Sequence, residues 1–355
     1  MLGVAVFIAL RELQFARGRF LLVGTIVVLM TVLVGFISGL TRGLANENTS
    51  AIDAIHADRI VFADTGDAPS YADSTITRHQ AREWSATEGV SDVEPFGLST
   101  VHASAADQQD TVAAFGVRPS ASVADAPTPQ QRGTIVVSAP ASESLGVDAG
   151  DSLTVAGTSY TVDTVAGDAT FSHLPAVWMP ITDWRSHVAN TSTYATVLAI
   201  SGTVNGDEPA GTTSVGLTDS YSAIGSYESE NGSLTLMTLM LYVISALVVG
   251  AFFVVWTLQR SGDLAVLKAL GASTASLVRG TLGQALIAVI SGVVIGLGLT
   301  ALAADLVGDD LPFVLDASTT LLPGVAMTAL GLAGSAASVR IVTASDPLQA
   351  LNRTI

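Results

Sequence analysis

Four long apolar runs constrain this chain more than any other feature of its sequence. They cover residues 20–40, 234–258, 276–304 and 319–339. A helix needs about 20 consecutive apolar residues to cross the hydrocarbon core of a bilayer, so each run predicts a transmembrane helix. The chain is 49% hydrophobic and only 13% charged, which is too apolar for a soluble protein of 355 residues. We therefore expect a membrane α-helical protein with four spans.

The segments around the spans predict which side of the membrane each one faces. Residues 1–19 mix apolar residues with Arg11, Arg17 and Arg19, and we expect an interfacial amphipathic helix on the inner leaflet. Arginines beside a first span hold the N-terminus inside, and four spans then return the C-terminus to the inside. The other short segments are a cytoplasmic coupling helix, an outer loop and a cytoplasmic tail, at residues 259–275, 305–318 and 340–355.

The long segment between the first two spans, residues 41–233, predicts a large α+β extracytoplasmic domain. Residues 41–59 continue the first span as a stalk helix, and Thr77 offers an N-cap for a helix over His79–Glu88. Residues 202–216 are rich in glycine and threonine and predict a loop. Short β-branched runs bounded by turn residues predict strands at Thr134–Val137, Ser152–Val155, Ser159–Val165 and Ala195–Ile200.

Several functions are disfavoured by the composition. The net charge of −16, with most acids on the outer side, argues against nucleic acid as a partner. The sole lysine, Lys268, does not lie in a phosphate-binding loop, so we expect no ATP site of that kind. The sequence has no G-x-S-x-G nucleophile elbow, and we expect no catalytic residue. The first two spans contain no Asp, Glu, Lys, Arg or His, which argues against an ion-coupled carrier. Four histidines show no metal-ligand spacing, and we expect them to be ordinary surface or core residues: His79, His102, His173 and His187.

The cytoplasmic segment Gln259–Ser273 reads QRSGDLAVLKALGAS and predicts a short helix that Gly271 ends. It could equally be a solvated loop joining two spans. However, it resembles the cytoplasmic loop of MacB/FtsX-type (type VII) ABC-transporter permeases, and Ser345–Leu351 (SDPLQAL) resembles their closing motif. Within the long domain, residues 133–180 resemble the small-barrel part of the MacB-type extracytoplasmic domain.

This resemblance implies a homodimer in the lipid bilayer that works with two copies of a separate ABC ATPase subunit, which binds the ATP and Mg²⁺. The residues that would couple to the ATPase are Arg260, Asp263, Leu267, Lys268, Leu270 and Gly271.

The opening ALRELQFARGRFLLVG resembles the HrtB-type haem-exporter permeases in the DevC-like branch of this family, which implies haem as cargo. Haem is flat, apolar and dianionic, and its iron takes His, Met, Tyr or carboxylate ligands. Candidate cargo residues near the outer ends of the first two spans are Phe36, Arg42, Glu47, His56, Tyr227, Glu230, Met237 and Met240. Five of them have a structural alternative: dimer packing for the two methionines, an interfacial anchor for Tyr227, and solvated stalk positions for Glu47 and His56.

Two other functions remain open on the sequence. One is export of a peptide antibiotic, lipid or lipoprotein. The other is a non-transporting mechanotransmission permease that activates a cell-wall hydrolase. The resemblance implies no cofactor of the chain's own and no metal beyond the iron of a haem cargo.

Overall fold

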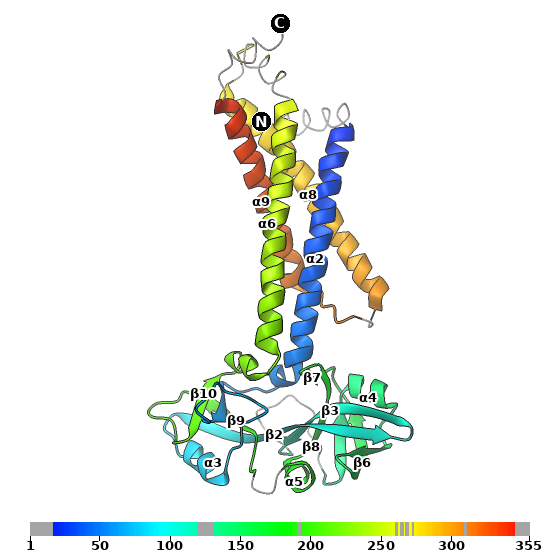
Figure 1. The fold of residues 1–355 in the computed structure, drawn as a ribbon, viewed down its shortest axis with the longest axis vertical. Helices are drawn as coiled ribbons and strands as arrows, with labels where there is room; N and C mark the ends of the chain where they lie inside the picture. Colours follow the sequence, from blue (N-terminus) through cyan, green and yellow to red (C-terminus); the bar gives the residue numbers. More distant parts are fainter. Residues whose placement is uncertain are drawn as a thin grey trace. The chain divides into compact units, whose positions relative to one another are not determined.

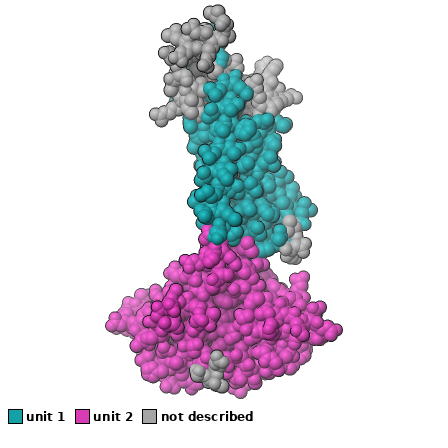
Figure 2. All heavy atoms as spheres, viewed as in Figure 1, with its two compact units in different colours: residues 1–43, 233–355 teal, residues 44–232 magenta. Residues whose placement is uncertain are grey.

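The computed structural model describes residues 17–119, 129, 131–189, 193–259, 262, 266, 270–271, 273–308 and 311–344. The chain divides into two compact units, coloured separately in Figure 2. Residues 1–43 and 233–355 form the helical unit, and residues 44–232 form the sheet unit. Most of the expected amphipathic helix (residues 1–16) and of the cytoplasmic tail (residues 345–355) lies outside the described residues.

Four helices are long and apolar enough to cross a membrane. They are α2 (Arg17–Asp53), α6 (Tyr227–Gln259), α8 (Thr274–Val307) and α9 (Ala317–Ala344), labelled in Figure 1. The sheet-rich segment lies between the first and second of them in the chain, so the expected fold class is confirmed.

The helical unit has a core to which all four helices contribute. Val27 from α2, Phe253 from α6, Val289 from α8 and Met327 from α9 belong to one cluster of buried apolar side chains. The aromatic ring of Phe253 lies 5.6 Å from that of Trp256. The helices therefore pack as a bundle through a continuous apolar seam.

A glycine pair sets the close approach of α8 to α2. A Cβ atom added at Gly292 would lie 2.7 Å from Val27 Cγ1, and one added at Gly296 would lie 2.6 Å from Thr31 Cβ. Carbon atoms do not pack at such distances, so only glycine fits at either position. Small residues four apart allow helices in membranes to approach closely. Gly292 and Gly296 therefore let α8 and α2 approach each other closely.

The sheet unit is built on a ten-stranded sheet. Its strands are β1 (Arg59–Ala63), β2 (Val90–Ala105), β3 (Gln108–Val117), β4 (Thr134–Val137), β5 (Ser152–Val155), β6 (Thr158–Val165), β7 (Thr170–Phe171), β8 (Leu174–Pro180), β9 (Val197–Gly202) and β10 (Thr212–Gly216). Short helical segments join them: α3 (Arg78–Ser85), α4 (Ala139–Leu145), α5 (Ile181–Asp183), a π-helix η1 (Trp184–Val188) and a 3₁₀ helix η2 (Asp219–Ala223).

Six of these strands close into a small barrel. The pairing runs β2–β3–β8–β4–β6–β5, and β5 returns to pair with β2 through Ala103 and Val155. Alternate residues of the strands point inward, and the enclosed side chains, such as Val112, Leu153 and Val177, form one buried cluster. Closure leaves the barrel without free sheet edges.

The other strands form an open sheet that shares β2 with the barrel. The first half of β2 pairs with β9, and β1 lies between β9 and β10 (Figure 1). Helix α3 covers this sheet with Trp84, which is fully buried and donates a hydrogen bond from Nε1 to Thr212 Oγ1 at 3.0 Å. Thr77 caps α3 in a reciprocal capping box with Gln80, as the sequence predicted.

Two secondary-structure expectations are wrong. The stalk helix does not extend to residue 59: α2 ends at Asp53, and the β-branched and aromatic run from Arg59 to Ala63 forms β1. Part of the expected loop at residues 202–216 is the strand β10. Its buried positions are polar, Thr212 and Ser214, so the hydropathy pattern carried no sign of a strand.

Candidate functional site

Two of the predicted cargo residues, Glu47 and Glu230, meet in the sheet unit on either side of His173. Glu47 lies near the end of α2, Glu230 lies in the first turn of α6, and His173 lies in the tight turn between β7 and β8. His173 Nδ1 is 2.9 Å from Glu47 Oε2, and Nε2 is 3.0 Å from Glu230 Oε2. Asn48 Nδ2 donates to the same Glu230 oxygen at 3.1 Å. We call these four residues the His173 clamp.

Backbone geometry brings the imidazole between the two carboxylates. Ser172 and His173 both have positive φ, 51° and 62°, as a two-residue hairpin turn requires. Their amides donate to the carbonyls of Asn48 and Glu47, at 3.1 and 3.2 Å, so the turn is fastened to α2. The clamp therefore joins three segments that are far apart in the sequence.

The two carboxylates favour the charged form of the imidazole. A neutral imidazole has one N–H group, whereas both ring nitrogens of His173 face carboxylate oxygens, and only the protonated ring can donate to both. Burial lowers the pKa of His173, but hydrogen bonds to Glu230 and Glu47 and their charges outweigh it, so this pKa is raised above its usual value. No sequence pattern indicates this role, because His173 has no partner at metal-ligand spacing in the sequence.

The remaining cargo candidates have different surroundings. In the helical unit, Phe36 packs against Phe313 with ring centroids 5.3 Å apart, and Arg42 Nε lies 3.7 Å from Asp316 Oδ2. Met237 and Met240 on α6 are 63% and 52% exposed. In the sheet unit, His56 is exposed, and the ring of Tyr227 lies 5.8 Å from that of Tyr221.

The predicted coupling segment is described only at some positions. Leu270 is 80% exposed and its amide donates to the carbonyl of Val266 at 3.0 Å, which is a helical turn. Gly271 follows with a φ of +93°, the conformation that glycine adopts where helices end. Arg260, Asp263, Leu267 and Lys268 lie outside the described residues.

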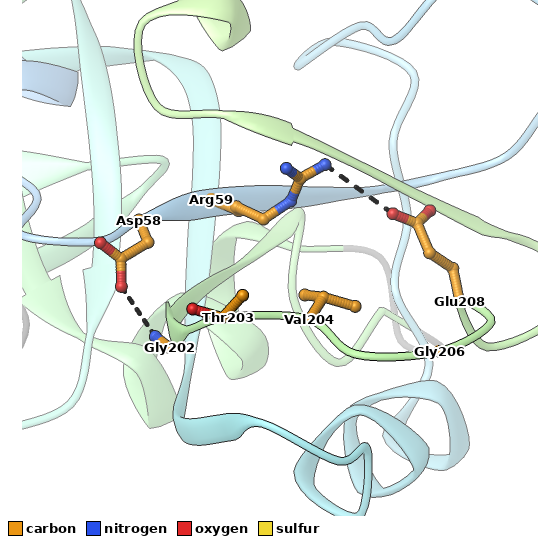
Figure 3. Close-up of a pocket in the computed structure, with 7 residues that line it drawn as sticks. All are labelled: Asp58, Arg59, Gly202, Thr203, Val204, Gly206 and Glu208. Atoms are coloured by element: carbon orange, nitrogen blue, oxygen red, sulfur yellow. Dashed lines mark hydrogen bonds and ion pairs between the residues drawn. The ribbon is translucent and has the colours of Figure 1, made fainter.

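A polar cavity of about 530 Å³ lies beside β1 in the sheet unit (Figure 3). Its charged side chains are occupied by internal contacts: Asp58 Oδ2 accepts from the amide of Gly202 at 2.7 Å, and Arg59 Nη2 lies 3.9 Å from Glu208 Oε1. Arg59 also donates from Nε to Ser214 Oγ at 2.8 Å. These contacts tie β1 and the residue before it to β9, to the loop that follows β9 and to β10, so we assign the cavity a structural role.

The fold and these sites define a four-span membrane protein with a sheet-rich domain inserted after its first helix. A comparison with known protein families identifies a domain within this membrane protein. Residues 235–347 match the family described as FtsX-like permease C-terminal. The chain carries an FtsX-like permease domain and is a permease-type component of an ABC transporter, a multi-pass protein of the plasma membrane.

Curated relatives match almost the whole chain. A putative hemin transport system permease protein HrtB of Staphylococcus epidermidis is 27% identical over 97% of this chain and 98% of its own. An uncharacterized ABC transporter permease of Mycobacterium bovis is 24% identical over 96% of this chain and 97% of its own. Among solved structures, the periplasmic region of MacB from Actinobacillus actinomycetemcomitans has a TM-score of 0.35 and 11% identity over 47% of this chain and 92% of that one.

Proposed function

We propose that the chain is the permease subunit of an ABC-type efflux pump that exports haem from the membrane. It forms a homodimer, and each copy pairs with a separate ATPase subunit. The observation that carries the proposal is the full-length similarity to permeases described as hemin transport proteins, 27% identity over 97% of the chain. The termini lie in the cytoplasm, because the arginines that flank the first span favour that side, and the sheet unit lies outside.

The first two spans support cargo uptake from within the membrane. They contain no Asp, Glu, Lys, Arg or His over residues 20–40 and 234–258, so they offer no charged channel for a charged solute. Haem is apolar over most of its area and can partition into a bilayer. ATP-driven closure of the dimer would then expel haem outward without carrying it across the inner leaflet.

Met237 and Met240 are the iron ligands that we propose on α6. They lie three residues apart, so they share one face of the helix, and both are more than half exposed in the single chain. Thioether sulfur is an established axial ligand of haem iron. The same exposure suits packing against a second copy, so the test must separate coordination from packing.

The test is an absorption titration of the full-length protein in detergent with haem. We expect a saturable Soret shift at about one haem per dimer. The double variant Met237→Leu/Met240→Leu keeps the apolar volume but removes both sulfur ligands. We expect it to change the Soret position and to weaken binding roughly tenfold or more. The matched control is Met327→Leu, a buried core methionine on α9 that should leave the spectrum unchanged.

Each outcome decides a separate part of the proposal. An unchanged spectrum in the double variant would show that the methionines only pack. A wild-type shift that grows with detergent concentration and never saturates would remove haem as cargo. Export of a peptide, lipid or lipoprotein would then become the better account of the same permease architecture.

A further inference from the structure

Four arginines of the sheet unit converge on one cavity, which nothing in the transport proposal uses. The cavity has a volume of about 460 Å³. Arg78 and Arg82 reach it from α3, Arg118 from the end of β3, and Arg185 from η1, with the ring of Tyr194 among them. Arg78 and Arg82 lie four residues apart and therefore share a face of α3.

This concentration of positive charge is unusual for its surroundings. Residues 44–232 contain 24 acidic residues, no lysine and only six arginines. Four of those six line this cavity. Like charges repel at such short range, so the cluster costs folding free energy unless an anion compensates it.

The described residues of the sheet unit supply little of that compensation. Among the ion pairs of the described residues, the one that involves a lining arginine joins Arg118 Nη1 to Glu94 Oε1 at 3.2 Å. Burial raises the pKa of Glu94, and the charge of Arg118 opposes this only in part. One carboxylate with a raised pKa cannot neutralise four guanidinium groups.

The guanidinium group of Arg185 is held in position by Tyr194, and one of its hydrogen-bond donors has no acceptor among the described residues. Its Nε donates to the carbonyl of Tyr194 at 2.6 Å, and its guanidinium lies 4.0 Å from the centre of the Tyr194 ring. Its Nη2 is buried and has no hydrogen-bond partner among the described residues. Burial lowers the pKa of Arg185, and the charges of Arg78 and Arg118 lower it further. A buried donor without an acceptor, surrounded by cations, marks the place of an anion.

We infer that this cavity, the arginine cavity, binds a phosphate group. Guanidinium groups match the oxygens of phosphate with paired hydrogen bonds, and several arginines can share one doubly charged phosphate. The volume fits a small phosphorylated molecule or the headgroup of an anionic lipid. The site is separate from the residues proposed for haem, so its test does not depend on the cargo.

The test uses the full-length protein in phosphate-free detergent and sodium pyrophosphate as the probe, measured by isothermal titration calorimetry. We expect saturable binding that weakens as sodium chloride is raised. The variant Arg78→Gln/Arg82→Gln removes two exposed arginines of α3 without disturbing a buried side chain. It should bind pyrophosphate roughly tenfold or more weakly. The control Arg132→Gln removes an exposed arginine outside the cavity and should bind normally.

A second experiment distinguishes a lipid headgroup from a soluble phosphate compound as the ligand. The protein is placed in nanodiscs of phosphatidylcholine with or without phosphatidylglycerol, and its melting temperature is measured. Stabilisation by phosphatidylglycerol that the double variant loses, without pyrophosphate binding, would assign a lipid headgroup. Pyrophosphate binding alone would assign a soluble phosphate. If the double variant matches wild type with both probes, or if neither probe binds, the inference is overturned.

Discussion

At the scale of single residues, the imidazole of His173 lies between the carboxylates of Glu47 and Glu230 and so joins the end of α2 to the start of α6. Glu47 and Glu230 were candidates because they lie near the outer ends of predicted spans. His173 is 126 positions from Glu47 in sequence, and one histidine in a short turn has no periodic or spaced partner. Such a contact depends on the tertiary fold, so no local pattern could have predicted it.

The clamp predicts a pH dependence of stability. Because the pKa of His173 is raised in the folded protein, the clamp stabilises the fold fully below the unfolded pKa of about 6.5. This contribution is lost as the pH rises through the folded pKa. The imidazole is 33% exposed, so solvent screening limits the contribution to about 1 kcal/mol. We expect His173→Gln to reduce the difference in melting temperature between pH 6 and pH 8.

The matched control is His79→Gln. His79 lies 3.2 Å from Glu83, but its side chain is 80% exposed, and its replacement should leave the pH dependence as in wild type. Equal pH dependence in wild type and His173→Gln would show that the clamp does not stabilise the protein.

At the scale of elements, the hydropathy pattern predicted the long apolar helices and some of the buried strands, because it reports directly on the length and spacing of apolar residues. The four long apolar helices contain the four predicted spans, and the strands β4 and β5 lie at the β-branched runs that predicted them. The end of α2 and the strand β10 were missed, because tertiary pairing with neighbouring strands decides both. β10 fills its buried positions with hydroxyl side chains that are satisfied by hydrogen bonds, such as Thr212 to Trp84.

Because Gly292 and Gly296 lie against α2, we expect a substitution at this pair to destabilise the protein more than the same substitution elsewhere on α8. Gly296→Ala would place a Cβ 2.6 Å from Thr31 Cβ, and the resulting overpacking should destabilise the protein by about 1–3 kcal/mol. Gly298 is two residues further along the same helix and has open space around it. Gly298→Ala should therefore keep the wild-type melting temperature in detergent. If both variants melt alike, α8 does not pack on α2 through this glycine.

We propose that the exposed turn at Leu270 belongs to the surface on which an ATPase subunit docks. Leu270 is 80% exposed, so Leu270→Asp should leave the melting temperature unchanged but reduce the amount of ATPase that copurifies. Leu270→Met keeps an apolar side chain and serves as the control. Full ATPase recovery with Leu270→Asp would place the docking surface elsewhere.

At the scale of the whole molecule, topology was the part least accessible from sequence. The 16-residue strand β2 serves both the open sheet and the barrel, and β5 closes the barrel by pairing back to β2. Those pairings join residues that are remote in sequence, and alternation of apolar residues does not specify a strand's partner. The arginine cavity is equally non-local, since its four cations come from two separate elements, α3 and η1, and from the chain segment just after β3.

The most direct test of haem export is the haem content of living cells. A haem-sensitive bacterium without its own haem exporter would express this chain together with its ATPase subunit and be exposed to haem. We expect lower cell-associated haem and growth at higher haem concentrations. Both effects should be lost when the lysine of the ATPase phosphate loop is replaced by alanine. Unchanged haem content and growth, with both subunits present in the membrane, would contradict haem export.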